Sequence, residues 1–218
     1  MTTRTTVWCG VGATCAAALA SLATYGSLPE QVPIHWNASG QVDGYASKIF
    51  GSSFMPVGMA VLLLLLFALP WLSPKNFKVE PFQGVFNYVM LVLIGLFLYI
   101  HGIMLDSALH PGQSFAKPMI GGLFVFFGLI GNMLGKVKRN FWMGIRVPWT
   151  LASDAVWDAT HRFAARLVVV ASFAGAIGVF FGVPIAWAFW VVIAAFIVPV
   201  FYSAWLSKRL EGETGDAS

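Results

Sequence analysis

The sequence predicts an all-α membrane protein of six transmembrane helices with both termini in the cytoplasm, and three observations support this fold class. First, 58% of the 218 residues are hydrophobic and 10% are charged, against roughly one quarter charged in an ordinary soluble domain. Second, six apolar stretches are long enough to cross a bilayer. Third, the lysines and arginines gather between alternate pairs of stretches. No part of the chain suggests a separate soluble domain, so residues 1–218 are expected to form one membrane domain.

A transmembrane helix needs about 20 mainly apolar residues. The stretches that meet this requirement are residues 5–25, 52–72, 82–105, 118–134, 163–181 and 184–207. The first follows Arg4 as a signal peptide would, but it is long, lacks an Ala-x-Ala cleavage site and precedes further spans, so we expect it to remain as the first helix. Cys9 and Cys15 lie within it at a spacing that suits neither a zinc site nor a disulfide framework, and we expect both to be buried.

The distribution of basic residues predicts the orientation, because cytoplasmic loops are rich in Lys and Arg. With the N-terminus inside, 11 of the 13 basic residues lie on the cytoplasmic side and two, Lys48 and Lys117, lie outside. The cytoplasmic set is Arg4, Lys75, Lys78, Lys136, Lys138, Arg139, Arg146, Arg162, Arg166, Lys208 and Arg209. An even number of spans then returns the C-terminus to the cytoplasm. The net charge of +4 therefore indicates membrane topology, and direct nucleic-acid binding is not expected.

Residues 27–50, between the first two stretches, are expected to form a structured extracellular loop. Prolines at positions 29 and 33 favour extended backbone before them, and the sequences at 37–40 and 43–44 are typical of turns. The candidate ligand-binding residues of this loop are His35, Asn37, Asp43 and Lys48. The same side chains can instead hold the turns together through local hydrogen bonds.

A divalent metal such as zinc is a further hypothesis for the outer face. His101, Asp106 and His110 lie at or just beyond the outer end of the third stretch, where ionisable groups are functional candidates. Together with His35 and Asp43 they offer metal-ligand chemistry, although their spacing matches no recognised metal motif. No other cofactor is expected.

Residues 136–162 are expected to form a cytoplasmic loop that ends in an interfacial helix. Basic residues at its start would contact anionic lipid headgroups, at about 1 kcal/mol each. Ser153 is expected to cap the helix, with Asp154 in the first turn where the helix dipole favours an acid. Asp158 and Arg162 stand four residues apart and can form an ion pair. The tryptophans expected in an aromatic belt at this level are Trp142, Trp149 and Trp157.

The sequence Gly-Ile-Arg-Val-Pro-Trp-Thr at residues 144–150 is more specific than membrane anchoring requires. An arginine with aromatic neighbours can anchor a protein interface. The candidate partner-binding residues on this side are Asn132, Lys136, Asn140, Arg146, Trp149, Trp157 and His161. Packing and contact with headgroups are their alternative roles.

Two segments resemble the SdpI family of bacterial membrane proteins, known as immunity proteins against a secreted killing peptide. Residues 28–48 resemble the domain of unknown function that often accompanies the family, and residues 131–162 resemble its C-terminal signature. Val147 stands where the family pattern has Thr, and Trp36 where Phe is more usual. The resemblance implies a multi-pass protein of the bacterial inner membrane that binds a peptide toxin outside and a small winged-helix repressor inside.

Two other classes remain open. Gly-rich spans, with His101 and Asp106 as a proton relay, would suit a transporter, but the other spans contain few ionisable residues. An outer-face metal would suit a membrane enzyme, but the chain contains no His-Glu-x-x-His, Gly-x-Ser-x-Gly or P-loop motif, so an enzyme is not expected. The partners expected are membrane lipids, a peptide toxin and the repressor, whereas the oligomeric state does not follow from the sequence.

Overall fold

The computed structural model describes residues 1–37, 41–74, 79–140 and 142–215. Its helices are α1 (Thr3–Thr24), α2 (Lys48–Leu72), α3 (Gln83–Leu109), α4 (Ala116–Leu134), α5 (Pro148–Ala152), α6 (Asp154–Phe180) and α7 (Ile185–Gly215). Two strands, β1 (Gln31–Trp36) and β2 (Val42–Ser47), lie between α1 and α2, and short 3-10 turns span Tyr25–Ser27 and Glu80–Phe82. Six of the helices are long and apolar enough to cross a membrane, as predicted.

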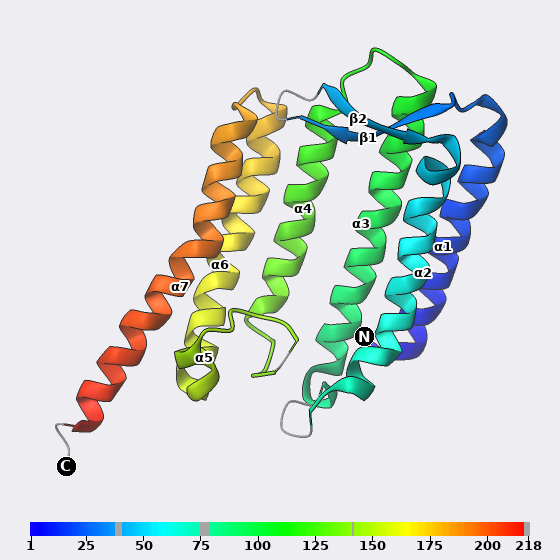
Figure 1. Cartoon of the computed structure of the whole chain (residues 1–218). Coiled ribbons are helices and arrows are strands. Elements are labelled where there is room, and N and C mark those ends of the chain that lie inside the picture. The colour runs from blue at the N-terminus through cyan, green and yellow to red at the C-terminus, as the bar shows by residue number, and fades with distance from the viewer. Residues whose placement is uncertain (38–40, 75–78, 141, 216–218) are drawn as a thin grey trace.

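The six long helices form two groups, visible in Figure 1. Helices α1, α2 and α3 pack together around Met59 and Ile94, whereas α4, α6 and α7 pack around Phe124 and Val168. Helices α3 and α4 join the groups along the bundle. At one end a further cluster connects them, because Trp157 of α6 packs with the buried side chains of α2 and α3.

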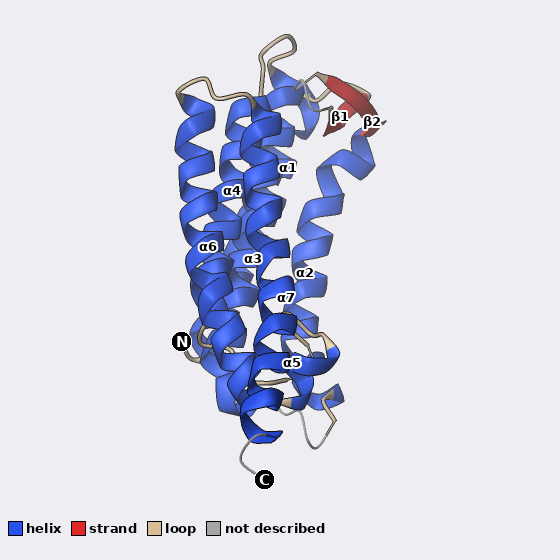
Figure 2. Cartoon of the chain, turned by 90° about the vertical axis from the view of Figure 1, so that its left-hand side faces the viewer, coloured by secondary structure: helices blue, strands red, loops and turns tan. Residues whose placement is uncertain are grey.

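Both termini and α5 lie at one end of the bundle, and the β1–β2 hairpin lies at the opposite end (Figures 1 and 2). This is the arrangement that an even number of spans requires. Lys48 opens α2 and Lys117 lies in the first turn of α4, so both predicted outer lysines are at the hairpin end. The positive-inside rule therefore assigns the hairpin to the outer face of this multi-pass bacterial membrane protein. Lys75, Lys78 and residues 38–40 of the predicted turn lie outside the described residues.

Ser153 caps a helix, as predicted, and this helix is the start of α6, which continues without a break into the fifth span. Two other local features differ from the predictions. A short helix, α5, precedes α6, and the sequence did not predict this helix. Cys9 and Cys15 are exposed on α1, because they lie on the face of that helix that its neighbours leave uncovered.

Candidate functional site

The outer loop is an antiparallel hairpin seated on the helix ends. Gln31 pairs with Ser47 and Trp36 with Val42. Val32 is fully buried, in a cluster with apolar side chains of α3. A Cβ added to Gly51 of α2 would lie 2.7 Å from the Cβ of Val32, so this glycine lets the hairpin approach α2 closely. The hairpin is thus a fixed part of the fold.

The candidate residues of the outer loop mainly contact one another or their own hairpin. Nδ1 of His35 lies 2.5 Å from Oδ1 of Asp43, and both side chains are exposed. Oδ1 of Asn37 accepts a 3.0 Å hydrogen bond from the backbone N–H of Gln41 and so closes the hairpin. The ammonium group of Lys48 lies 4.7 Å from the centre of the Tyr25 ring, at cation–π distance. His35 and Asp43 are the pair that faces outward.

The structure does not bring the predicted metal ligands together. His35 and Asp43 form one pair on the hairpin, and Asp106 and His110 form a second, 2.7 Å pair at the end of α3. His101 is buried between helices, away from both pairs. Among the residues that the structure describes, no three His, Cys, Asp or Glu side chains are grouped so that they could hold a metal ion. The predicted set is therefore wrong as a single site, because chain folding separates it into three places.

His101 belongs to a buried polar cluster that the sequence did not reveal. The Ser21 hydroxyl donates a 2.6 Å hydrogen bond to the carbonyl oxygen of Ser52, and it also lies 2.8 Å from Nε2 of His101. Nε2 of His101 also lies 3.2 Å from the carbonyl oxygen of Ala17, which can only accept. Since the hydroxyl hydrogen is already used, Nε2 carries the proton and is the donor to both oxygens. The cluster links α1, α2 and α3 within the apolar bundle. Serines inside apolar stretches were the available signal, since such side chains often form bonds between helices.

Asn140 organises the inner loop between α4 and α5. Its side chain is fully buried. Its Nδ2 donates to the carbonyl oxygens of Lys138 and Met143 at 2.8 and 2.9 Å. Its Oδ1 accepts from the backbone N–H groups of Trp142 and Met143 at 2.7 and 2.8 Å. The amide therefore uses its full hydrogen-bonding capacity within the loop, which makes Asn140 a structural residue.

His161 and Trp157 form the platform on which the loop lies. Both are buried on α6, and their rings stack with centroids 4.0 Å apart. Nε2 of His161 accepts a 2.9 Å hydrogen bond from the backbone N–H of Ile145, and Nε1 of Trp157 donates to the carbonyl oxygen of Val137 at 2.7 Å. Gly144 crosses this platform at φ +115°, and a Cβ there would lie 2.5 Å from Nε2 of His161. A glycine is therefore required at this point of the loop.

Two tryptophans connect the inner loop to distant helices. Nε1 of Trp149, on α5, donates a 2.6 Å hydrogen bond to the hydroxyl of Ser203 on α7. Nε1 of Trp142 donates to the hydroxyl of Ser73, just beyond α2. The predicted aromatic belt is thus also a set of specific hydrogen bonds, and it joins the two helix groups at this end.

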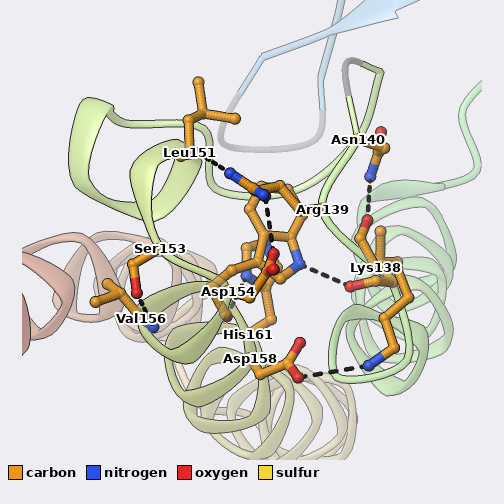
Figure 3. A network of polar contacts seen from close by, with 11 residues as sticks. Lys138, Arg139, Asn140, Leu151, Ser153, Asp154, Val156, Asp158 and His161 are labelled. Carbon is orange, nitrogen blue, oxygen red and sulfur yellow. Dashed lines mark hydrogen bonds and ion pairs between the residues drawn. The ribbon is translucent and has the colours of Figure 1, made fainter. Parts of the chain in front are cut away.

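Two ion pairs fasten the loop to the first turns of α6, as Figure 3 shows. Nε of Arg139 lies 2.8 Å from Oδ1 of Asp154, and Nζ of Lys138 lies 3.4 Å from Oδ2 of Asp158. The expected partner of Asp158 was Arg162. Asp158 instead pairs with Lys138, because the loop folds back over this face of the helix.

Three of the inner candidate residues lie at the surface. Asn132, Lys136 and Arg146 are exposed. Lys136 borders a cleft of about 450 Å³ that also contains Glu80 and Tyr88. The inner set predicted from sequence therefore divides into a buried or half-buried framework and a smaller, exposed group. Thr150 belongs to the framework and was missed: it is fully buried, and its hydroxyl lies 2.7 Å from the carbonyl oxygen of Ile145.

Comparison with known proteins gives separate matches for the part of the chain that holds the hairpin and for the part that holds the inner loop. Residues 136–203 match the SdpI/YfhL protein family, and residues 13–60 match a domain of unknown function, DUF1648. The chain is 28% identical over 167 residues to the "Immunity protein SdpI" of Bacillus subtilis (strain 168). The aligned region covers 77% of this chain and 78% of that protein. No solved structure gives a significant match. The resemblance to the SdpI family is therefore confirmed: the chain carries the family's segment at residues 136–203 and the accompanying domain of unknown function at residues 13–60.

Proposed function

We propose that this protein is a membrane immunity protein, which protects the cell that makes it from a secreted peptide toxin by binding and not by catalysis. The observation that carries the proposal is the similarity to an immunity protein over 167 residues, 77% of the chain, together with the family match at residues 136–203. The six membrane-spanning helices agree with this role, because they place the protein at the membrane, where a peptide from outside first reaches the cell.

The hairpin supports recognition of the toxin from outside. It is the main structured element at the outer end among the described residues, and its buried Val32 fixes it to the bundle. Its outward surface carries the His35–Asp43 pair. A surface that is already ordered loses little conformational entropy when it binds a flexible peptide.

The second part of the proposal is that the inner loop holds a cytoplasmic winged-helix repressor when toxin is bound. In support, the loop is ordered by Asn140 and His161, which leaves Lys136 and Arg146 exposed on a fixed framework. The hydrogen bonds of Trp142 and Trp149 connect this framework to both helix groups. A shift between those groups would therefore change the exposed surface of the loop.

Survival of a sensitive host tests the first part. Cells that express the protein are exposed to the killing peptide of the family, beside cells that express His35→Ala or Arg146→Ala at verified membrane levels. Protection by the parent supports immunity, and its loss in His35→Ala places recognition at the hairpin. Arg146→Ala is expected to keep protection and to lose repressor retention, measured as membrane-bound repressor. A parent chain that gives no protection rejects immunity to that peptide.

A further inference from the structure

A cleft of about 290 Å³ opens at the outer end, between the hairpin and the turn that joins α3 to α4. The hairpin contributes Pro33, Val42 and Tyr45, and the turn contributes Pro111 and Gln113. None of the side chains that line this outer cleft carries a charge. Its volume is close to the lower end of the range for small-ligand pockets, about 300–1,000 Å³. It therefore fits one or two side chains of a larger molecule.

The lining determines the chemistry of what can bind. Proline rings, Val42 and the Tyr45 ring form apolar walls, while Gln31 and Gln113 add neutral amides. Tyr45 is 57% exposed although it lies on a well-packed hairpin. Tyrosines of this kind supply large contact area at low entropic cost and are common at binding surfaces. Glutamine side chains can bond to both the N–H and C=O groups of a peptide. An apolar or aromatic side chain on a peptide backbone fits this lining.

Both walls of the outer cleft are held in place by the fold. The hairpin wall is fixed by Val32, which is buried against α3. The other wall is a tight turn, in which Gly112 adopts φ +94° and the backbone N–H of His110 bonds to the carbonyl oxygen of Asp106 at 2.9 Å. The outer cleft therefore exists before any ligand binds.

The charged side chains at this end do not line the outer cleft. The segments here carry the acids Glu30, Asp43 and Asp106 and the lysines Lys48 and Lys117. Two of the acids already have partners, since Asp43 contacts His35 and Asp106 contacts His110. An uncharged lining disfavours burial of a charged side chain, so the side chain that enters the cleft is expected to be uncharged.

We propose that the outer cleft recognises the peptide toxin by taking one of its large uncharged side chains, aromatic or aliphatic. This inference rests on the proposed immunity function and names its binding site. The occupant is an extracellular peptide, because the outer cleft opens on the face that the positive-inside rule places outside.

Survival and labelling together test the inference. Tyr45→Ala removes a wall and Gln113→Trp fills the space, while Phe181→Ala is the matched control, because Phe181 is an exposed aromatic residue outside the outer cleft and next to the α6–α7 turn. The probe is the killing peptide of the family, with a scrambled peptide of equal composition beside it. We expect the peptide concentration that kills half the cells to fall about tenfold in the two cleft variants and to stay unchanged in Phe181→Ala.

Labelling measures binding directly. In a Cys9→Ala, Cys15→Ala background, Gln113→Cys is labelled from outside with a membrane-impermeant maleimide, and Phe181→Cys is the control. The inference predicts that the killing peptide, but not the scrambled one, slows labelling only at position 113. If the parent chain fails to protect cells, the proposed function itself is overturned. If the parent protects, but the cleft variants protect equally and labelling at position 113 is unaffected, the cleft assignment alone is overturned.

Discussion

The backbone N–H of Ile145 donates a 2.9 Å hydrogen bond to Nε2 of His161, a residue 16 positions further along the chain. Because Nε2 accepts this bond, it carries no proton, and Nδ1 must be the donor to the carbonyl oxygen of Trp157 at 2.8 Å. The imidazole is thus neutral, with a single tautomer. One buried ring therefore joins the inner loop to α6. The predictions for His161 and Gly144 depend on that contact.

Replacing His161 with Ala is expected to lower the free energy of unfolding by about 1–3 kcal/mol, because it leaves the buried N–H of Ile145 without an acceptor. The measurement is thermal unfolding of the purified protein in detergent, where each kcal/mol corresponds to about 2–4 °C for a chain of this size. His110→Ala is the control, since that histidine is exposed and its ion pair contributes about 0–1 kcal/mol. Equal melting temperatures for the two variants would contradict this role of His161.

Gly144→Ala is expected to destabilise the protein more than Gly182→Ala. Both glycines have positive φ, +115° and +94°, so both variants carry a backbone cost of about 1–3 kcal/mol. A Cβ at Gly144 would also meet His161 at 2.5 Å, whereas a Cβ at Gly182 would meet nothing within 4 Å. The difference between their melting temperatures reports the contacts of this Cβ with His161 and with the Trp157 ring, which it would meet at 3.0 Å. In a His161→Ala background this difference should shrink, and a constant difference would refute the contact.

Asn140→Asp is expected to cost at least about 1–3 kcal/mol, because a carboxylate cannot donate to the carbonyl oxygens of Lys138 and Met143. Asn132→Asp makes the same chemical change at an exposed position of α4 and should stay within about 0.5 kcal/mol of the parent. Limited proteolysis of the inner loop offers a second readout, and faster cleavage is expected in Asn140→Asp alone. Unchanged stability and cleavage would show that the loop does not depend on this amide.

Ser21→Ala is expected to destabilise the packing of α1 against α2 and α3 by about 1–3 kcal/mol. It removes one of the two partners of Nε2 of buried His101 and leaves the carbonyl oxygen of Ser52 without the Ser21 hydroxyl as donor. Ser53→Ala serves as the control, since its hydroxyl is exposed and bonds within its own helix, to Ile49. Thermal unfolding in detergent is again the measurement. Equal melting temperatures for Ser21→Ala and Ser53→Ala would show that this polar cluster does not stabilise the helix packing.

Two predictions that depend on neighbouring residues alone were confirmed. The six spans follow from apolar length, a local property, and the Ser153 cap needs only the adjacent turn, where its hydroxyl accepts from the backbone N–H of Val156 at 3.3 Å. The pairing of Asp158 with Arg162 was a local prediction that did not hold. Lys138, 20 positions away, is brought to the same carboxylate by the fold, and a one-helix pattern does not include it.

The sequence by itself determined the membrane class, the number of spans, the side of the basic residues and the two family segments, because hydrophobic length, charge and motif order can be read along the chain. The tertiary structure alone decided that Asn140, Trp157 and His161 form a buried framework and that the predicted metal ligands lie in three places. It also decided that Tyr45 and Gln113 line the same outer cleft. The physical reason is that burial, hydrogen-bond partners and clefts depend on how distant segments pack. A pattern among neighbouring residues in the sequence does not indicate that packing.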